Sequence, residues 1–430
     1  MKSGYKWLLL GLLSLAFFFN QADRVLFGLL TIPIQEEFGL TDLQIGFVNT
    51  ALFVTIAITV PLAGFLGDRF SRKWVITVSL LFWSLMTACT GLVGGIGGLI
   101  FFRSIATGGG ESFYCPSAYA LLAAHHKETR SLAMAVHQAA LYIGLMFSGA
   151  IVAWVLAKLR AAAWIASLFG EKGCWRPVFI VFGAAGMMLG IAFVWLLKEG
   201  AGATDGRAAP CRVRERARHP FAQAIRAFFC CPTLILNAVG FVAIVFANNA
   251  YLSWAPKFVA RKFNLSVGAA GSGTMFYHHL CAFVAILAAG YFTDSMVRRG
   301  HPRFRLFLQS TAMMLGAPML VWVGFAPSVV AVFSATMLYG VFRGFYEANT
   351  QASAFDVVRP ENRATVVALA DLMAMLIGSL SPLMIGALSD RMGMRGFEIG
   401  FSILGVSYFI GAVAMFAAAF FTFEKDRVSE

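Results

Sequence analysis

Seven ionisable side chains fall inside long apolar stretches of the sequence, where charge is costly. They are Asp23, Arg24, Arg103, Glu111, Arg343, Glu347 and Asp371. At the centre of a lipid bilayer each such charge costs about 2.5–3.5 kcal/mol on the insertion scale. We therefore expect these side chains to pair with one another or to face a water-filled cavity, and each is a candidate functional residue.

Two chemistries suit these residues. The planar guanidinium of Arg24 or Arg103 can donate two parallel hydrogen bonds to a carboxylate, so either could bind an anionic substrate. A carboxyl group in apolar surroundings favours its neutral form, so Glu111 could carry a proton; a structural hydrogen bond is the alternative. Arg103 and Glu111 are eight residues apart, which on an α-helix means about 12 Å of rise and about 80° of rotation. They are too far apart to pair, so each needs a partner elsewhere.

The remaining charges have two readings each. Arg343 and Glu347 stand at i, i+4, a spacing that favours an ion pair within one helix. Asp371 is either a partner at an inner gate or a carboxylate in a cavity. Several polar side chains could line a cavity and bind substrate there, as hydrogen-bond donors or as aromatic surface. They could instead join helices by hydrogen bonds. These are His137, Gln138, Asn248, Asn249 and Tyr251.

Motifs for catalysis, metal binding and cofactor binding are missing from the sequence. The adjacent His278 and His279 would point about 100° apart on a helix, so they poorly share one metal ion. The chain contains no nucleotide-binding G-x-x-x-x-G-K-[ST], no H-E-x-x-H, no G-x-S-x-G and no C-x-x-C, which disfavours an ATPase, a protease, a lipase and a redox enzyme. We predict no enzyme activity, no metal and no cofactor.

The composition indicates which elements must position these residues. The chain has 430 residues, 59% hydrophobic and only 13% charged, with a mean hydropathy of +0.75. Soluble domains are about 25% charged, so this chain has too little charge to cover a water-facing surface. Seven cysteines are too few for a disulfide-built secreted domain. The chain is predicted to be a membrane protein.

Twelve apolar runs are long enough to cross a bilayer as helices, which takes about 20 residues. They lie at 7–30, 44–66, 74–94, 97–122, 131–158, 175–197, 232–256, 269–293, 304–325, 328–352, 364–388 and 398–422. The runs lack the alternation of membrane strands. The first is followed by no cleavage site, so we expect a retained helix and not a signal peptide. The sequence predicts an all-α membrane protein with twelve transmembrane helices.

The positions of lysine and arginine predict the orientation. Most of the 34 basic residues fall in alternate loops and both tails, which places the two termini in the cytoplasm and the chain in the plasma (inner) membrane. The net charge of +13 then reflects topology and contacts with anionic membrane lipids, and not binding of nucleic acid. The polar stretch 198–231 is read as a cytoplasmic linker. It separates the expected domains, a six-helix bundle in 1–197 and another in 232–430.

The two halves of the sequence repeat. Residues 64–73 have the pattern G-x-x-x-D-x-x-x-R/K-R/K after the second run, and residues 290–299 repeat the pattern after the eighth. Two further pairs match at similar offsets, namely Arg103 with Arg343, and Glu128 with Glu361. The repeat predicts two pseudo-symmetric six-helix bundles with a cavity between them.

These features resemble the major facilitator superfamily. Residues 64–73 match, at every defining position, the superfamily's loop between spans two and three, and the repeat extends the resemblance over essentially the whole chain. Residues 20–24, 34–39 and 82–85, with Gly46 and Arg103 to Glu111, resemble the anion:cation symporter branch, which moves sugar acids and other organic anions with protons. Residues 64–73 and 110–114 are also similar to the Spinster-like branch, which carries lysolipid-type substrates. Both branches place the arginine and the glutamate of span four seven residues apart, against eight here.

The resemblance implies a secondary transporter that works by alternating access. Asp23 and Glu111 would take up protons, and a small anion would dock on Arg24 or Arg103; an Arg103–Asp23 bridge that only fixes the bundle is the alternative. The coupling ion would be a proton, with sodium as the other candidate, and the chain would act as a monomer. The repeated motif would latch the bundles, unless its charges only mark topology. Its residues are Gly64, Gly67, Asp68, Arg69, Arg72 and Lys73, with Asp294 and Arg298 in the second copy.

Overall fold

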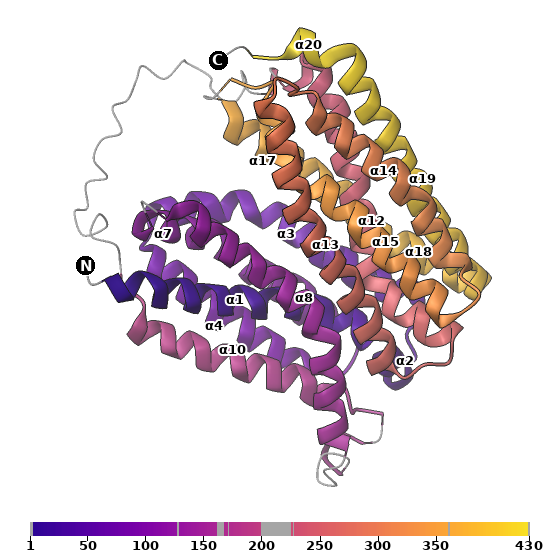
Figure 1. Cartoon of the computed structure of the whole chain (residues 1–430). Coiled ribbons are helices and arrows are strands. Elements are labelled where there is room, and N and C mark those ends of the chain that lie inside the picture. The colour runs from indigo at the N-terminus through magenta and orange to yellow at the C-terminus, as the bar shows by residue number, and fades with distance from the viewer. Residues whose placement is uncertain are drawn as a thin grey trace. The chain divides into compact units, whose positions relative to one another are not determined.

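The computed structural model describes residues 3–126, 129–160, 167–170, 172–198, 225–226, 228–359 and 362–428. These residues form helices and contain no strand (Figure 1). Glu128, Glu361 and most of the expected linker lie outside the described residues.

The helices of the first half follow one another with short connections. They are α1 (Ser3–Leu29), α2 (Thr31–Phe38), α3 (Asp42–Arg69), α4 (Arg72–Thr90), α5 (Ile96–Gly98), η1 (Leu99–Ala106), α6 (Thr107–Glu111), α7 (Tyr114–His125), α8 (Arg130–Arg160) and α10 (Arg176–Leu196). Here η1 is a π-helix.

The second half contains a second set of helices. They are α12 (Pro232–Lys262), α13 (Val267–Arg298), α14 (Phe304–Phe325), α15 (Val329–Glu347), α16 (Thr350–Phe355), α17 (Arg363–Gly378), α18 (Leu380–Met392), α19 (Met394–Ala417), the π-helix η3 (Ala418–Thr422) and α20 (Phe423–Asp426).

Eleven of the twelve expected spans are long apolar helices in the described part of the chain. The remaining span is the fourth along the chain, expected at 97–122. It is instead a succession of four shorter segments, α5, η1, α6 and α7. The prediction of an all-α membrane protein is therefore confirmed. The prediction of one regular helix over 97–122 is wrong, because a π-helix and an interruption after Glu111 divide it.

Local sequence signals explain where several helices begin and end. Gly39 ends α2 in the left-handed region, at φ 63°, a conformation that glycine adopts without strain. Thr41 then starts α3 with a capping box: its hydroxyl accepts from the backbone N–H of Gln44, and the Gln44 side chain accepts from the backbone N–H of Thr41. Ser71 caps α4 in a similar way, by accepting from the backbone N–H of Trp74.

Contacts divide the chain into two compact units. One comprises Met1–Val213 with Leu265–Met275, and the other comprises Arg214–Asn264 with Phe276–Glu430. In the first, α1 packs along α8, and α4 packs along α10 and against α6 and α7. A core that includes Leu13, Trp83 and Tyr114 fills the space between these helices. In the second, α14 packs against α15 and α19, and α12 packs against α17 and α19. Each unit thus has its own packed interior.

Candidate functional site

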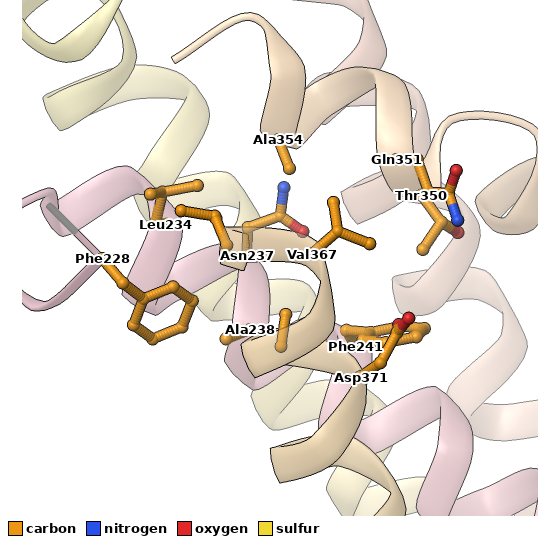
Figure 2. Close-up of a pocket in the computed structure, with 12 residues that line it drawn as sticks. Phe228, Leu234, Asn237, Ala238, Phe241, Thr350, Gln351, Ala354, Val367 and Asp371 are labelled. Carbon is orange, nitrogen blue, oxygen red and sulfur yellow. The ribbon is translucent and has the colours of Figure 1, made fainter. Parts of the chain in front are cut away.

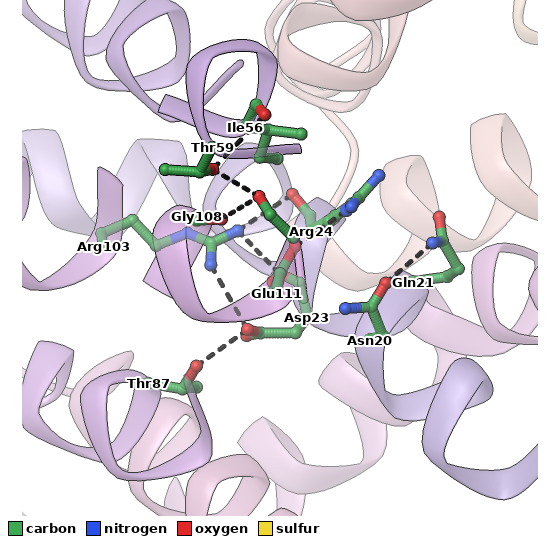
Figure 3. A network of polar contacts seen from close by, with 11 residues as sticks. Asn20, Gln21, Asp23, Arg24, Ile56, Thr59, Thr87, Arg103, Gly108 and Glu111 are labelled. Atoms are coloured by element: carbon green, nitrogen blue, oxygen red, sulfur yellow. Dashed lines mark hydrogen bonds and ion pairs between the residues drawn. The ribbon is translucent and has the colours of Figure 1, made fainter. Parts of the chain in front are cut away.

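The candidate site of the first unit lies where α1, α4 and the segmented fourth span meet. Asp23 and Arg24 are adjacent on α1, and adjacent helical side chains point about 100° apart. Each therefore reaches a different partner: Asp23 meets Arg103 of η1, and Arg24 meets Glu111 at the end of α6 (Figure 3). The expectation that Arg103 and Glu111 pair with other helices and not with each other is confirmed.

Arg103 is enclosed by α1. Its Nη1 lies 3.4 Å from Oδ2 of Asp23, and its Nη2 donates to the backbone oxygens of Asp23 at 2.8 Å and Arg24 at 3.1 Å. The hydroxyl of Thr87 on α4 donates to the same Asp23 oxygen at 2.8 Å. Arg103 is 1% exposed and Asp23 3%. This guanidinium is therefore largely committed to protein partners.

Arg24 is held differently. Its Nε donates to Oε2 of Glu111 at 2.8 Å, while 21% of the Arg24 side chain remains exposed and the Glu111 side chain is fully buried. The other Glu111 oxygen, Oε1, is buried and has no hydrogen-bond partner among the described residues. Of the two arginines of this site, Arg24 is the more exposed.

The π-helix explains how residues eight apart both face α1. A π-turn takes more residues than an α-turn, so it absorbs one extra residue in a helix that otherwise continues. The rotation of about 80° expected for a regular helix therefore does not apply between Arg103 and Glu111. With one residue absorbed, the spacing approximates two turns, and both side chains lie on one face. π-Turns of this kind are frequent at functional sites.

The second unit contains a separate polar cluster on α13 and α15. Arg343 donates from Nε to Glu347 at 2.9 Å, which confirms the ion pair predicted from their spacing. The Nη1 of Arg343 also lies 3.1 Å from Nε2 of His278, whose ring is stacked on that of Tyr339 at 4.8 Å and tilted against that of Tyr251 at 4.6 Å. Sequence reasoning considered His278 only as a metal ligand. Its apolar neighbours in the sequence gave no signal of an arginine 65 residues away.

The other predicted binding residues are spread over both units. His137 is fully buried, stacks on Phe17 at 4.5 Å and lies 3.1 Å from the Tyr114 hydroxyl. Gln138 is exposed and accepts from the Tyr119 hydroxyl at 3.1 Å.

On α12, polar side chains are buried to different extents. Asn249 is buried and Asn248 partly so, and each has an amide atom without a partner in the described chain. Tyr251 is fully buried. Sequence reasoning ended this span at residue 256 and missed Lys257, which is 1% exposed with Nζ 5.2 Å from the ring centre of Trp254. A longer window over this run would have included this charge.

Comparison with known families decides the identity of the chain at the level of family. The family model described as the Major Facilitator Superfamily matches residues 13–382. The chain belongs to the Major Facilitator Superfamily. It is therefore a multi-pass membrane transporter, in agreement with its repeated motif and apolar runs.

Relatives within the superfamily include both branches that the sequence resembles. Protein spinster homolog 1 of Xenopus tropicalis is 24% identical over 437 residues, which cover 95% of this chain and 79% of the relative. The D-galactonate transporter of Escherichia coli is 26% identical over 283 residues, 65% of this chain and 64% of the relative. The crystal structure of a bacterial homolog of the human lysosomal transporter Spinster is 22% identical and covers 100% of both chains at a TM-score of 0.85. This last likeness shows that the fold is that of the superfamily.

The superfamily's repeated motif lies at the ends of α3 and α13. Arg72 donates to the backbone oxygen of Ala120 at 3.5 Å, and Lys73 donates to that of Val194 at 2.8 Å, so both tie α4 to its neighbours. Arg69 is exposed, as are Asp294 and Arg298 in the second copy. Gly64 and Gly67 are helical residues of α3, as is Asp68, whose side chain lies outside the described ones.

Asp371, the last of the predicted charges, lies on α17 of the second unit. It is partly buried and lines a pocket with residues of α12 and α16 (Figure 2). Its surroundings differ from those of the other membrane carboxyl groups.

Proposed function

We propose that the chain is a proton-coupled symporter of a small organic anion such as a sugar acid, and that it works by alternating access. The observation that supports this most is the Arg24–Glu111 pair, in which a fully buried carboxylate is the counter-ion of a partly exposed guanidinium. The name of one relative, the D-galactonate transporter, suggests the class of substrate.

Charge balance links the proton to the anion. With Glu111 ionised, the Arg24–Glu111 pair is neutral, and an arriving anion would add one uncompensated charge to a site of low dielectric. With Glu111 protonated, Arg24 loses its counter-ion, and an anion restores neutrality through a charge-assisted hydrogen bond. The site is therefore neutral when both ligands are bound or when both are absent, which is the condition for symport.

We assign a positioning role to Arg103 and Asp23. Asp23 accepts from both Thr87 of α4 and Arg103 of η1, so its carboxylate joins α1 to both elements. Arg103 in turn binds two backbone oxygens of α1, which fixes the side chain of Arg24 next to Glu111. The polar residues His137, Gln138, Asn248, Asn249 and Tyr251 remain candidates for recognition of the rest of the substrate.

The remaining parts of the proposal concern topology and gating. We place both termini in the cytoplasm, because basic residues concentrate in alternate loops. We also propose that the chain acts as a monomer in the plasma (inner) membrane. The motif on α3 and α4, with its second copy on α13, then lies on the cytoplasmic side and would stabilise one state of the transport cycle.

A second candidate is a carrier of lysolipid or another amphipathic molecule. It is favoured by the extent of one similarity: Protein spinster homolog 1 matches 95% of this chain, against 65% for the D-galactonate transporter. In such a carrier Arg24 would bind an anionic headgroup and not a sugar acid.

Transport by the purified chain in liposomes separates these candidates. We expect D-galactonate, or another sugar acid, to accumulate when the outside is more acidic and to stop accumulating when an uncoupler removes the gradient. Lysophosphatidate and lysophosphatidylcholine serve as the competing substrates. Transport of a lysolipid with no proton-driven accumulation of any sugar acid would contradict symport of a small anion and favour the second candidate.

A further inference from the structure

Asp371 has surroundings unlike those of the other membrane carboxyl groups. Glu111 pairs with Arg24, Asp23 with Arg103 and Glu347 with Arg343. No ion pair or hydrogen bond joins Asp371 to any residue in the described parts of the chain. A carboxylate at membrane depth is costly without a positive partner, so this position calls for a ligand that supplies one.

The arginine of the same helix, α17, contacts groups other than Asp371. Arg363, at the start of α17, donates to the backbone oxygens of Val358 at 3.3 Å and Phe355 at 3.2 Å, and lies 5.5 Å from the ring centre of Phe355. Its charge thus satisfies the end of α16 and not the carboxylate. The parts of α12 and α16 that line the pocket contain no lysine or arginine.

The pocket beside Asp371 has the form of a binding site. It lies between the start of α12, α16 and α17, all within the second unit, and is open, so that its empty space of about 370 Å³ includes adjoining solvent. Its walls are mostly apolar, and Phe241, Phe228 and the Asp371 carboxyl group are among the groups that line it (Figure 2). The side-chain amide of Asn237 donates to Ser353 at 2.9 Å, so part of the polar lining is already engaged.

This lining discriminates between kinds of cation. Hard inorganic cations take several oxygen ligands at once, whereas this pocket offers one carboxylate among apolar and aromatic groups. An organic ammonium group needs one counter-charge, an aromatic face and apolar contact for its carbons. We propose that the pocket binds a small organic ammonium group, with the Asp371 carboxylate as its counter-ion and the Phe241 ring as its aromatic wall.

Binding of choline to the purified full-length chain in nanodiscs tests this. We expect saturable binding of radiolabelled choline that excess unlabelled choline displaces, and at least about tenfold weaker competition by 3,3-dimethyl-1-butanol, which has the same shape without the charge. Asp371→Asn removes the counter-charge and should abolish the binding. Asp390→Asn, which removes an exposed carboxylate on α18 of the same unit, should leave it unchanged.

A second variant tests the site independently of how well Asp371→Asn folds. Phe241→Leu keeps the apolar volume but removes the aromatic face, so choline affinity should fall about threefold to thirtyfold. Binding that survives Asp371→Asn, equal competition by the neutral alcohol, or displacement by sodium but not by potassium at the same ionic strength would each overturn the proposal.

The proposal is independent of anion symport, because the pocket lies in the second unit and shares no residue with the Arg24–Glu111 pair. Glu111→Gln should therefore impair proton-driven transport and keep choline binding. Loss of choline binding in Asp371→Asn, with binding retained in Asp390→Asn and Glu111→Gln, would support this site even if no sugar acid were transported.

Discussion

The two arginines of the first unit carry the same charge but have different environments. Arg103 is 1% exposed and binds Asp23 and two backbone oxygens, whereas 21% of the Arg24 side chain is exposed and its described ion pair is with Glu111. A residue with several buried partners contributes mainly to stability, because its removal leaves them unsatisfied. A residue with one exchangeable partner can pass from that partner to a ligand.

Replacement of each arginine by lysine should separate these roles. Lysine keeps the charge but loses the planar fork. In Arg24→Lys we expect the KM for the anion to rise about tenfold or more, because the variant loses a hydrogen bond to a charged group. Thermal stability should be nearly unchanged.

In Arg103→Lys we expect the reverse, a lower melting temperature with the KM of the remaining folded protein nearly unchanged. Uptake kinetics and thermal unfolding of the same preparations measure both quantities. A large rise in KM for Arg103→Lys alone would show that Arg103, and not Arg24, contacts the substrate.

Glu111→Gln tests the proton carrier. Glutamine can still hydrogen-bond to Arg24 but neither ionises nor takes up a proton, so exchange of substrate across the membrane should persist while accumulation under a pH gradient falls to the equilibrium ratio of about one. Counterflow and gradient-driven uptake distinguish the two activities. Glu424→Gln, which removes an exposed carboxyl group paired with Arg303, is the matched control. Full accumulation by Glu111→Gln would exclude this residue as the carrier.

At the scale of elements, the segmented fourth span decides the geometry of the site. Apolar run length predicted eleven of the twelve spans as long helices, because hydrophobic length is a property of each segment alone. The i, i+4 spacing likewise predicted the Arg343–Glu347 pair.

The π-helix could not be predicted directly from the sequence. Its one indirect sign is the spacing of eight residues, instead of seven, between Arg103 and Glu111. The Asp23–Arg103 contact joins residues 80 apart in the sequence, and such a contact depends on tertiary packing that no local pattern encodes.

The glycines before Glu111 allow a test of this packing. A Cβ on Gly110 would lie 2.8 Å from Cδ1 of Phe82, and one on Gly108 would lie 2.9 Å from Cδ1 of Leu52; on Gly109 the nearest atom, Cγ2 of Thr55, would be 3.9 Å away. Close approach of this kind needs glycine. Gly108→Ala and Gly110→Ala should each lower the melting temperature, at a cost of about 1–3 kcal/mol from overpacking. Gly109→Ala should be tolerated, and equal behaviour of all three variants would contradict close packing as the reason for the run.

At the scale of the whole molecule, the internal repeat extends to details of hydrogen bonding. Helix is interrupted directly after Glu111 in the fourth span and directly after Glu347 in the tenth. In the first unit the hydroxyl of Thr59 on α3 donates to Ser112 at 2.7 Å, and in the second the amide of Asn349 donates to Thr293 on α13 at 3.1 Å. The charges nevertheless differ: Glu347 pairs within its own helix, whereas Glu111 pairs with α1. Because Glu111, unlike Glu347, has a partly exposed arginine of another helix as its partner, we expect a single coupled proton.

A cycle with one proton and one monovalent anion transfers no net charge. A potential of 100 mV acts on a single net charge with about 2.3 kcal/mol, a factor of about fifty in accumulation. We therefore expect a potassium diffusion potential of 100 mV, set with valinomycin, to leave the accumulation of D-galactonate unchanged within about twofold. A pH gradient of one unit should drive about tenfold accumulation, because one pH unit corresponds to about 1.36 kcal/mol per proton. Accumulation that rises about fiftyfold with an inside-negative potential would require a second positive charge in the cycle, and Asp371 would then be the first carboxyl group to examine as its carrier.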